Sequence, residues 1–269
     1  MKGATLKTPQ EHFEYARDMI RVSFFFAKKF LTKKFPDKTV GELIREHTPA
    51  LYHGLNYKDH QTRWDNPDCN RILARANELS ALSPEDFEEE MWKSVEELTR
   101  KRAEINYPDA VGIKAPASWH CGSLTYDPPN PHIQPGYMVF HIANGACPYS
   151  IFDDPTYLPF CFRLLMKETE VKYDAIGLYT LTWLNSNPRW LKYFPQEWLD
   201  NMQKPDYSKL ETPGWSFGDW GQLVTGRGTI NKKVEALVRT EGRLKYLALR
   251  STCSYANMKK HLDENFPDK

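Results

Sequence analysis

Long apolar segments are missing from this sequence. The longest, at residues 22–26 and 137–140, are far shorter than the ~18–20 residues that a membrane-spanning helix needs. The N-terminal residues also lack the uninterrupted apolar stretch of a secretory signal, and they have the pattern that leads into a helix. We therefore expect a soluble protein with no membrane partner.

An excess of charge of either sign is missing as well. The chain has 36 basic and 35 acidic residues, which gives a formal net charge of +1. Because no global field favours a polyanion, nucleic acid is not expected as a partner. The 14 Phe, 14 Tyr and 8 Trp can form a substantial core, so disorder is excluded. Nothing in the composition indicates an oligomeric state.

Cysteine is scarce and has no regular spacing. The five cysteines are odd in number and include no C-x-x-C pair: Cys69, Cys121, Cys147, Cys161 and Cys253. This pattern excludes the disulfide framework of a small secreted protein. It predicts reduced thiols, and with them a cytoplasmic location.

The common catalytic and cofactor motifs are also absent. The sequence contains no G-x-x-x-x-G-K-[ST] phosphate loop, no G-x-S-x-G nucleophile elbow, no H-E-x-x-H zinc helix and no EF-hand loop. Gly226 and Gly228 match two glycines of a dinucleotide fingerprint, but no strand–turn–helix of the right length surrounds them. We therefore interpret them as a turn and expect no cofactor.

The N-terminal third has the pattern of charged helices. Apolar residues at steps of three and four predict a helix over about residues 9–34. Thr39 and Glu42 form a capping-box pattern at the start of the next helix. Two more helices are expected at 68–80 and 84–105.

Ser83 is the expected N-cap of the second of these helices, followed by Pro84. The acid-rich run at residues 85–90 is most simply a solvated face of that helix.

The remainder is richer in proline, glycine and aromatic residues. From 107 to 134 the pattern is that of a boundary or a long loop. A strand at 136–145, a helix at 156–173 and a strand at 175–184 form a β–helix–β order, as between parallel strands. A helix at 189–202, interrupted at Pro195, and a strand at 246–250 are also expected.

The expected fold class is therefore α+β, with a helical N-terminal third packed on a small, bent mixed sheet. We divide the chain into a helical region, 1–106, and an α+β region, 107–269, which together form one compact domain.

The first candidate site lies on the strand at 136–145. Alternation places Tyr137 and His141 on one face, and Phe140 and Ile142 on the other. We expect the two ring side chains to be about 7 Å apart along the strand and to contact one small molecule. His141 would be the general acid or base, and Tyr137 and Asn144 would orient the substrate. The alternative is a half-buried histidine bonded to a backbone carbonyl.

Two further segments are candidates for substrate binding. Thr182, Trp183 and Asn185 lie where the second strand ends, which is where ligands often bind in α/β proteins. They could equally form a turn before Pro188.

Trp215, Trp220 and Gln222 lie in a glycine-containing aromatic segment that could line a pocket for a flat ligand. Ordinary packing in the core is the alternative for these three residues.

Three functional hypotheses remain open at this level. The first is a metal-independent enzyme of lyase, isomerase or hydrolase type that acts on a small organic substrate, aromatic ones included, in an aromatic-lined pocket. The second is a metal-dependent enzyme that uses His120, His132 and His141, with Asp127 or Glu170 as a further ligand. The third is a ligand-binding protein without catalysis. We favour the first hypothesis.

Overall fold

The computed structural model describes residues 7–55, 66–110, 121–130, 132–146 and 149–267. The chain divides into two compact units, here called the helical unit (Leu6–Lys114 with Asp206–Lys245) and the sheet unit (Ala115–Pro205 with Tyr246–Lys269). The division expected near residue 107 takes no account of residues 206–245, which group with the N-terminal helices. Each unit has its own apolar core.

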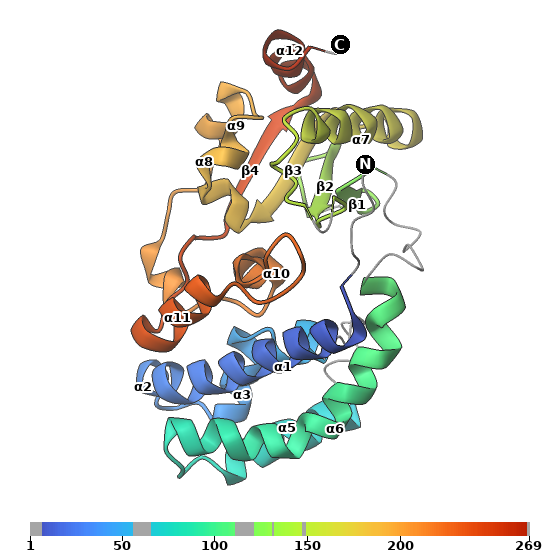
Figure 1. Cartoon of the computed structure of the whole chain (residues 1–269). Coiled ribbons are helices and arrows are strands. Elements are labelled where there is room, and N and C mark those ends of the chain that lie inside the picture. Colours follow the sequence, from blue (N-terminus) through green and yellow to red (C-terminus); the bar gives the residue numbers. More distant parts are fainter. Residues whose placement is uncertain (1–6, 56–65, 111–120, 131, 147–148, 268–269) are drawn as a thin grey trace. The chain divides into compact units, whose positions relative to one another are not determined.

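The helical unit contains long helices in its N-terminal part and short ones after residue 206 (Figure 1). The elements are α1 (Pro9–Phe26), a π-helical segment (Ala27–Leu31), α2 (Thr32–Lys34), α3 (Val40–His47), a second π-helical segment (Ala50–Gly54), α5 (Pro67–Glu78), α6 (Pro84–Ala110), α10 (Phe217–Trp220) and α11 (Lys232–Glu241), with 3₁₀ turns at Tyr207–Leu210 and Gly221–Leu223. The helices expected at 9–34, 68–80 and 84–105 are confirmed, the first with a π-helical segment inside it.

Side-chain caps explain where these helices begin. The Thr8 hydroxyl accepts a hydrogen bond from the Glu11 amide, and the Glu11 carboxylate accepts one from the Thr8 amide. Thr39 and Glu42 form the same reciprocal pair at the start of α3, as expected. At α6 the Ser83 hydroxyl accepts from the Asp86 amide at 3.1 Å. Each cap satisfies amides that have no partner within the helix.

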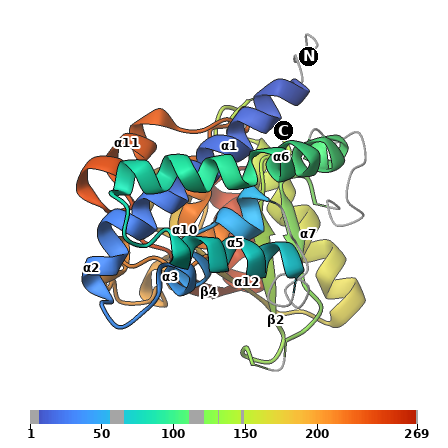
Figure 2. The same ribbon diagram turned by 90° about the horizontal axis from the view of Figure 1, so that it is seen from below.

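The core of the helical unit forms where α6 lies along α1 (Figure 2). Met19, Val22 and Phe26 of α1 are fully buried, as are Phe87 and Met91 of α6. These positions recur at helical spacing, so one face of each helix supplies the apolar contact.

The sheet unit contains a mixed sheet in which the strand order equals the chain order (Figure 1). Its strands are β1 (Leu124–Tyr126), β2 (Tyr137–Ile142), β3 (Gly177–Thr182) and β4 (Leu249–Ser254). β1 is antiparallel to β2, β2 is parallel to β3, and β3 is antiparallel to β4. The expected parallel β–helix–β arrangement is confirmed, with α7 (Tyr157–Tyr173) as the helix.

Two strand predictions need correction. β1 lies inside the stretch at 107–134, for which the sequence predicts a boundary or loop. The pattern of this stretch does not reveal the strand, because the pairing partner of β1, β2, lies outside it. β4 begins at Leu249, three residues after the expected start at Tyr246, and pairs with β3 along its whole length.

One face of the sheet is buried against helices of its own unit. Met138 and Phe140 of β2, Leu178 of β3 and Cys253 of β4 are almost completely inaccessible. They share a core with α7 and with three helices that follow β3: α8 (Pro188–Leu191), α9 (Gln196–Asp200) and α12 (Tyr255–Asn265). The α+β class is therefore confirmed. The N-terminal helices bury a separate core of their own.

Candidate functional site

The opposite face of the sheet, here called the open face, carries His141. Strand register places Thr125 opposite His141, and Val139 opposite Tyr179, so all four side chains share this face. His141 is exposed and the other three are half-buried. The predicted alternation along β2 is therefore confirmed, with Met138 and Phe140 on the other side in the core.

His141 forms a hydrogen bond with a carboxylate from the neighbouring strand. Its Nε2 lies 2.8 Å from Oδ2 of Asp127, the residue that follows β1. The Asp127 amide donates to the Val139 carbonyl at 3.1 Å, which continues the β1–β2 pairing and holds the carboxylate beside β2. The two side chains are 56% and 54% exposed, so solvent and small molecules can reach both.

This hydrogen bond determines the chemistry that the pair can perform. The bond to His141 lowers the pKa of Asp127, so its carboxylate is charged near neutral pH. A charged carboxylate only accepts hydrogen bonds, so the proton between the two groups belongs to Nε2 of His141. In the neutral ring, Nδ1 is then the basic nitrogen, and it has no hydrogen bond with any described residue.

Tyr137 does not lie next to His141. They are four positions apart on β2, so at about 3.3 Å per residue they are ~13 Å apart and not ~7 Å as expected. The Tyr137 ring instead covers Gly177 on β3, where an added Cβ would lie 2.4 Å from Cε1 of the ring. Burial raises the pKa of Tyr137, so its phenol stays protonated near neutral pH. Direct proton exchange between these two side chains is excluded by this spacing.

The other predicted residues of the sheet unit make structural bonds. Asn144 closes the turn after β2, where it accepts from the Ala146 amide and donates to the Tyr149 carbonyl. The buried Thr182 hydroxyl accepts from the Leu184 amide at the end of β3. Trp183 stacks on Tyr246 with ring centroids 5.7 Å apart.

Asn185 makes three side-chain hydrogen bonds inside the core. It is 1% exposed, and its Nδ2 donates to the Leu249 carbonyl at 2.8 Å. Its Oδ1 accepts from the indole N–H groups of Trp190 and Trp198, at 3.0 and 3.3 Å. The amide therefore joins β4 to α8 and α9 inside the core.

The three predicted pocket residues of the aromatic segment belong to the helical unit. Trp220 is fully buried, and its indole donates to the Gly214 carbonyl at 2.8 Å. Gln222 is 2% exposed and connects the Asp219 carbonyl to the Lys245 amide. Trp215 is half-buried and packs with its edge against Tyr52, with centroids 5.4 Å apart. The contacts of Trp220 and Gln222 are those of a core rather than of a pocket wall.

The metal alternative has no supporting cluster in the described part of the chain. His120 lies outside the described residues, and His132 is exposed on a turn. Within the described ranges, no three His, Cys, Asp or Glu side chains come together in a way that could hold a metal ion.

Every cysteine side chain is buried in the part of the chain that is described. Cys69, Cys121, Cys161 and Cys253 are buried and form no disulfide with one another, as predicted, while Cys147 lies outside the described residues. Burial raises the pKa of Cys121 to about 11, so a thiolate nucleophile is not available there near neutral pH.

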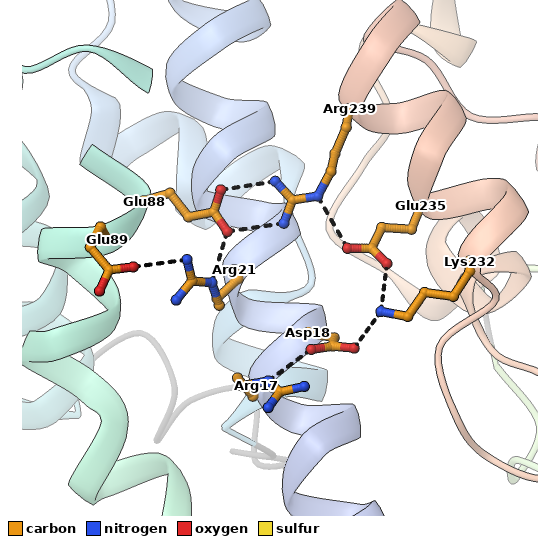
Figure 3. A network of polar contacts seen from close by, with 8 residues as sticks. All are labelled: Arg17, Asp18, Arg21, Glu88, Glu89, Lys232, Glu235 and Arg239. Atoms are coloured by element: carbon orange, nitrogen blue, oxygen red, sulfur yellow. Dashed lines mark hydrogen bonds and ion pairs between the residues drawn. The ribbon is translucent and has the colours of Figure 1, made fainter. Parts of the chain in front are cut away.

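Sequence reasoning missed an ion network in the helical unit (Figure 3). Glu88, within the acid-rich run expected to be solvated, is only 6% exposed. Its carboxylate accepts from Arg21 and, through two nitrogens, from Arg239 at 2.8–2.9 Å. Arg239 lies 151 residues away in the sequence, so no local pattern could have identified it.

No protein-family model matches this chain, and comparisons with curated proteins and with solved structures returned no match either. Across the described residues, no helix has both the length and the apolar composition that crossing a membrane would require.

Proposed function

We propose that this chain is a cytoplasmic enzyme that performs acid/base catalysis on a small organic substrate, aromatic ones included, with His141 as the acid or base. The observation that carries the proposal is the 2.8 Å bond between His141 and Asp127 on the open face. An imidazole held by a carboxylate is suited to the proton transfers of lyases, isomerases and hydrolases. The four described cysteines, which are buried and form no disulfide with one another, support the cytoplasmic location.

Each member of the pair has a separate role in this proposal. His141 takes a proton at Nδ1, and the adjacent Asp127 carboxylate stabilises the imidazolium that forms. Asp127 also fixes the tautomer, because it accepts the hydrogen of Nε2. Val139 and Tyr179, half-buried on the same face, offer apolar surface for the rest of the substrate.

The proposal is tested with 4-nitrophenyl acetate, an activated ester whose hydrolysis an imidazole promotes. We expect hydrolysis near neutral pH to exceed that of free imidazole at the same concentration. His141→Gln should lower the rate by about 10²-fold or more, in line with the usual contribution of a positioned acid or base. Asp127→Asn should lower it less, by about tenfold, because the base remains but loses its orienting carboxylate.

His132→Gln is the matched control, because His132 is also an exposed histidine of the sheet unit. Circular dichroism of each variant should match the parent chain. The proposal is wrong if the parent is no faster than free imidazole, or if the two histidine variants lose the same fraction of the rate.

A further inference from the structure

The helical unit contains a groove that none of the predicted site residues lines. It has a volume of about 610 Å³, within the range of pockets for small molecules. Its lining comes from α1, α6 and α11: Gln10, Phe13, Arg17, Asp18, Arg21, Trp92, Glu96, Arg100 and Arg239. Four guanidinium groups and two tightly packed aromatic rings thus meet at one cavity.

Two of the four arginines are bound to carboxylates of the ion network through two or three of their nitrogens. Arg239 donates through all three nitrogens, to Glu88 and Glu235, and Arg21 donates to Glu88 and Glu89 (Figure 3). These bonds compensate the buried Glu88 carboxylate. Arg21 and Arg239 are therefore structural members of the ion network.

Arg17 and Arg100 have donors to spare. Arg17 bonds to Asp18 through Nε alone, at 2.9 Å, and its two terminal nitrogens have no partner among the described residues. Arg100 makes one long bond, at 3.4 Å, from Nη2 to Glu96. A guanidinium has five N–H donors in a fixed plane, and that plane matches the two oxygens of a carboxylate or phosphate. Both side chains therefore offer an unused fork to a ligand.

The groove also holds these groups in place. The Arg100 guanidinium carbon lies 4.1 Å from the centre of the Phe13 ring, a cation–π contact that restricts the side chain. Phe13 and Trp92 are themselves packed in the core, 7% and 6% exposed. Asp18, the acid beside Arg17, already accepts from Lys232 at 2.7 Å. Its charge is thus shared between two cations, and repulsion of an incoming anion is reduced.

We propose that this groove binds a small organic oxyanion, a molecule that presents a phosphate or carboxylate group to Arg17 and Arg100. The apolar part of the ligand contacts Phe13 and Trp92. The eight network residues in Figure 3 are balanced, with four cations and four anions. Directed donors, rather than net positive charge, are therefore what selects the ligand.

Isothermal titration with three probes that share one ring tests the proposal: phenyl phosphate, benzoate and benzyl alcohol. We expect saturable binding of at least one anion at low ionic strength, weakened by added salt, and no binding of the neutral alcohol. Phenyl phosphate alone, benzoate alone, or both binding supports the site and identifies the group that it recognises. Arg17→Gln and Arg100→Gln should each weaken binding about tenfold or more, since each removes a charge-assisted bond.

Arg75→Gln is the matched control. Arg75 belongs to the same unit, has a 43% exposed side chain, and is paired with Glu78 one helical turn away, as Arg100 is with Glu96. Thermal unfolding confirms that each variant is folded. The proposal is overturned if neither anion binds up to ~10 mM, if benzyl alcohol binds as tightly as the anions, or if Arg75→Gln weakens binding as much as Arg100→Gln.

Discussion

The helical unit buries a carboxylate, Glu88, whereas the sheet unit buries an amide, Asn185. Glu88 is 6% exposed and accepts three hydrogen bonds from two arginines, whereas Asn185 is 1% exposed and makes three bonds to neutral groups. A buried charge must be matched by opposite charge, because its desolvation costs several kcal/mol. A buried amide needs only its hydrogen-bond partners.

Glu88 and Asn185 each join elements that are distant in the sequence, but in different ways. The ion network links α1, α6 and α11 through long side chains that are partly in solvent, so it tolerates small movements (Figure 3). The amide at Asn185 links β4 to two indoles inside a closely packed aromatic core, where small movements disturb the hydrogen bonds. We therefore expect the sheet unit to be the more sensitive to a single polar substitution.

The largest effect is expected for Asn185→Ala. It leaves the N–H groups of Trp190 and Trp198 and the Leu249 carbonyl buried without their partner, which should cost about 3–5 kcal/mol of unfolding free energy. Urea denaturation followed by tryptophan fluorescence measures this loss. Asn201→Ala is the control, since Asn201 is exposed and makes one bond, to the Thr252 carbonyl. Equal losses in the two variants would contradict the assigned role of Asn185.

The next effect tests the helical unit. Glu88→Gln removes the charge that compensates Arg21 and Arg239 and should cost about 2–4 kcal/mol in the same experiment. Glu90→Gln should change stability by less than ~0.5 kcal/mol, because Glu90 pairs with Lys93 at the surface. If Glu88→Gln costs more than Asn185→Ala, the greater sensitivity that we assign to the sheet unit is wrong.

A smaller, pH-dependent effect is expected at His12. The ring is 8% exposed, its Nδ1 is buried without a hydrogen bond among the described residues, and burial lowers its pKa from 6.5 to about 4. His12 is therefore protonated below about pH 6.5 in the unfolded chain, but only below about pH 4 in the folded chain. Stability from this group is present above pH 6.5 and is lost as the pH falls toward 4, by up to about 3 kcal/mol.

Unfolding free energies measured between pH 7 and pH 4 check this expectation. His12→Phe should flatten the pH dependence, because the packing of the ring with Tyr15 and Tyr107 can be kept while the titrating group is removed. His132→Gln, at an exposed position, should leave the slope unchanged. A slope that persists in His12→Phe would assign the acid sensitivity to another group.

The sequence by itself determined the local structure. Thr39 and Glu42 identify the start of α3 because their caps are formed by residues three apart, and the helix at 156–173 was predicted to within one residue of α7. Alternation in β2 correctly separated Phe140 from His141, because side chains of a strand point to opposite faces in turn.

Only the tertiary structure decided which polar residues are partners. His141 bonds to Asp127 across a strand pair, 14 residues away, and Glu88 bonds to Arg239, 151 residues away. Asn185, which the sequence assigned to a turn or to a substrate, is held by Leu249, 64 residues away. Spacing along the chain determines the face on which a side chain lies. The cost of desolvating a buried polar group is compensated by hydrogen-bond and ion-pair partners, and the tertiary fold determines which residues these are.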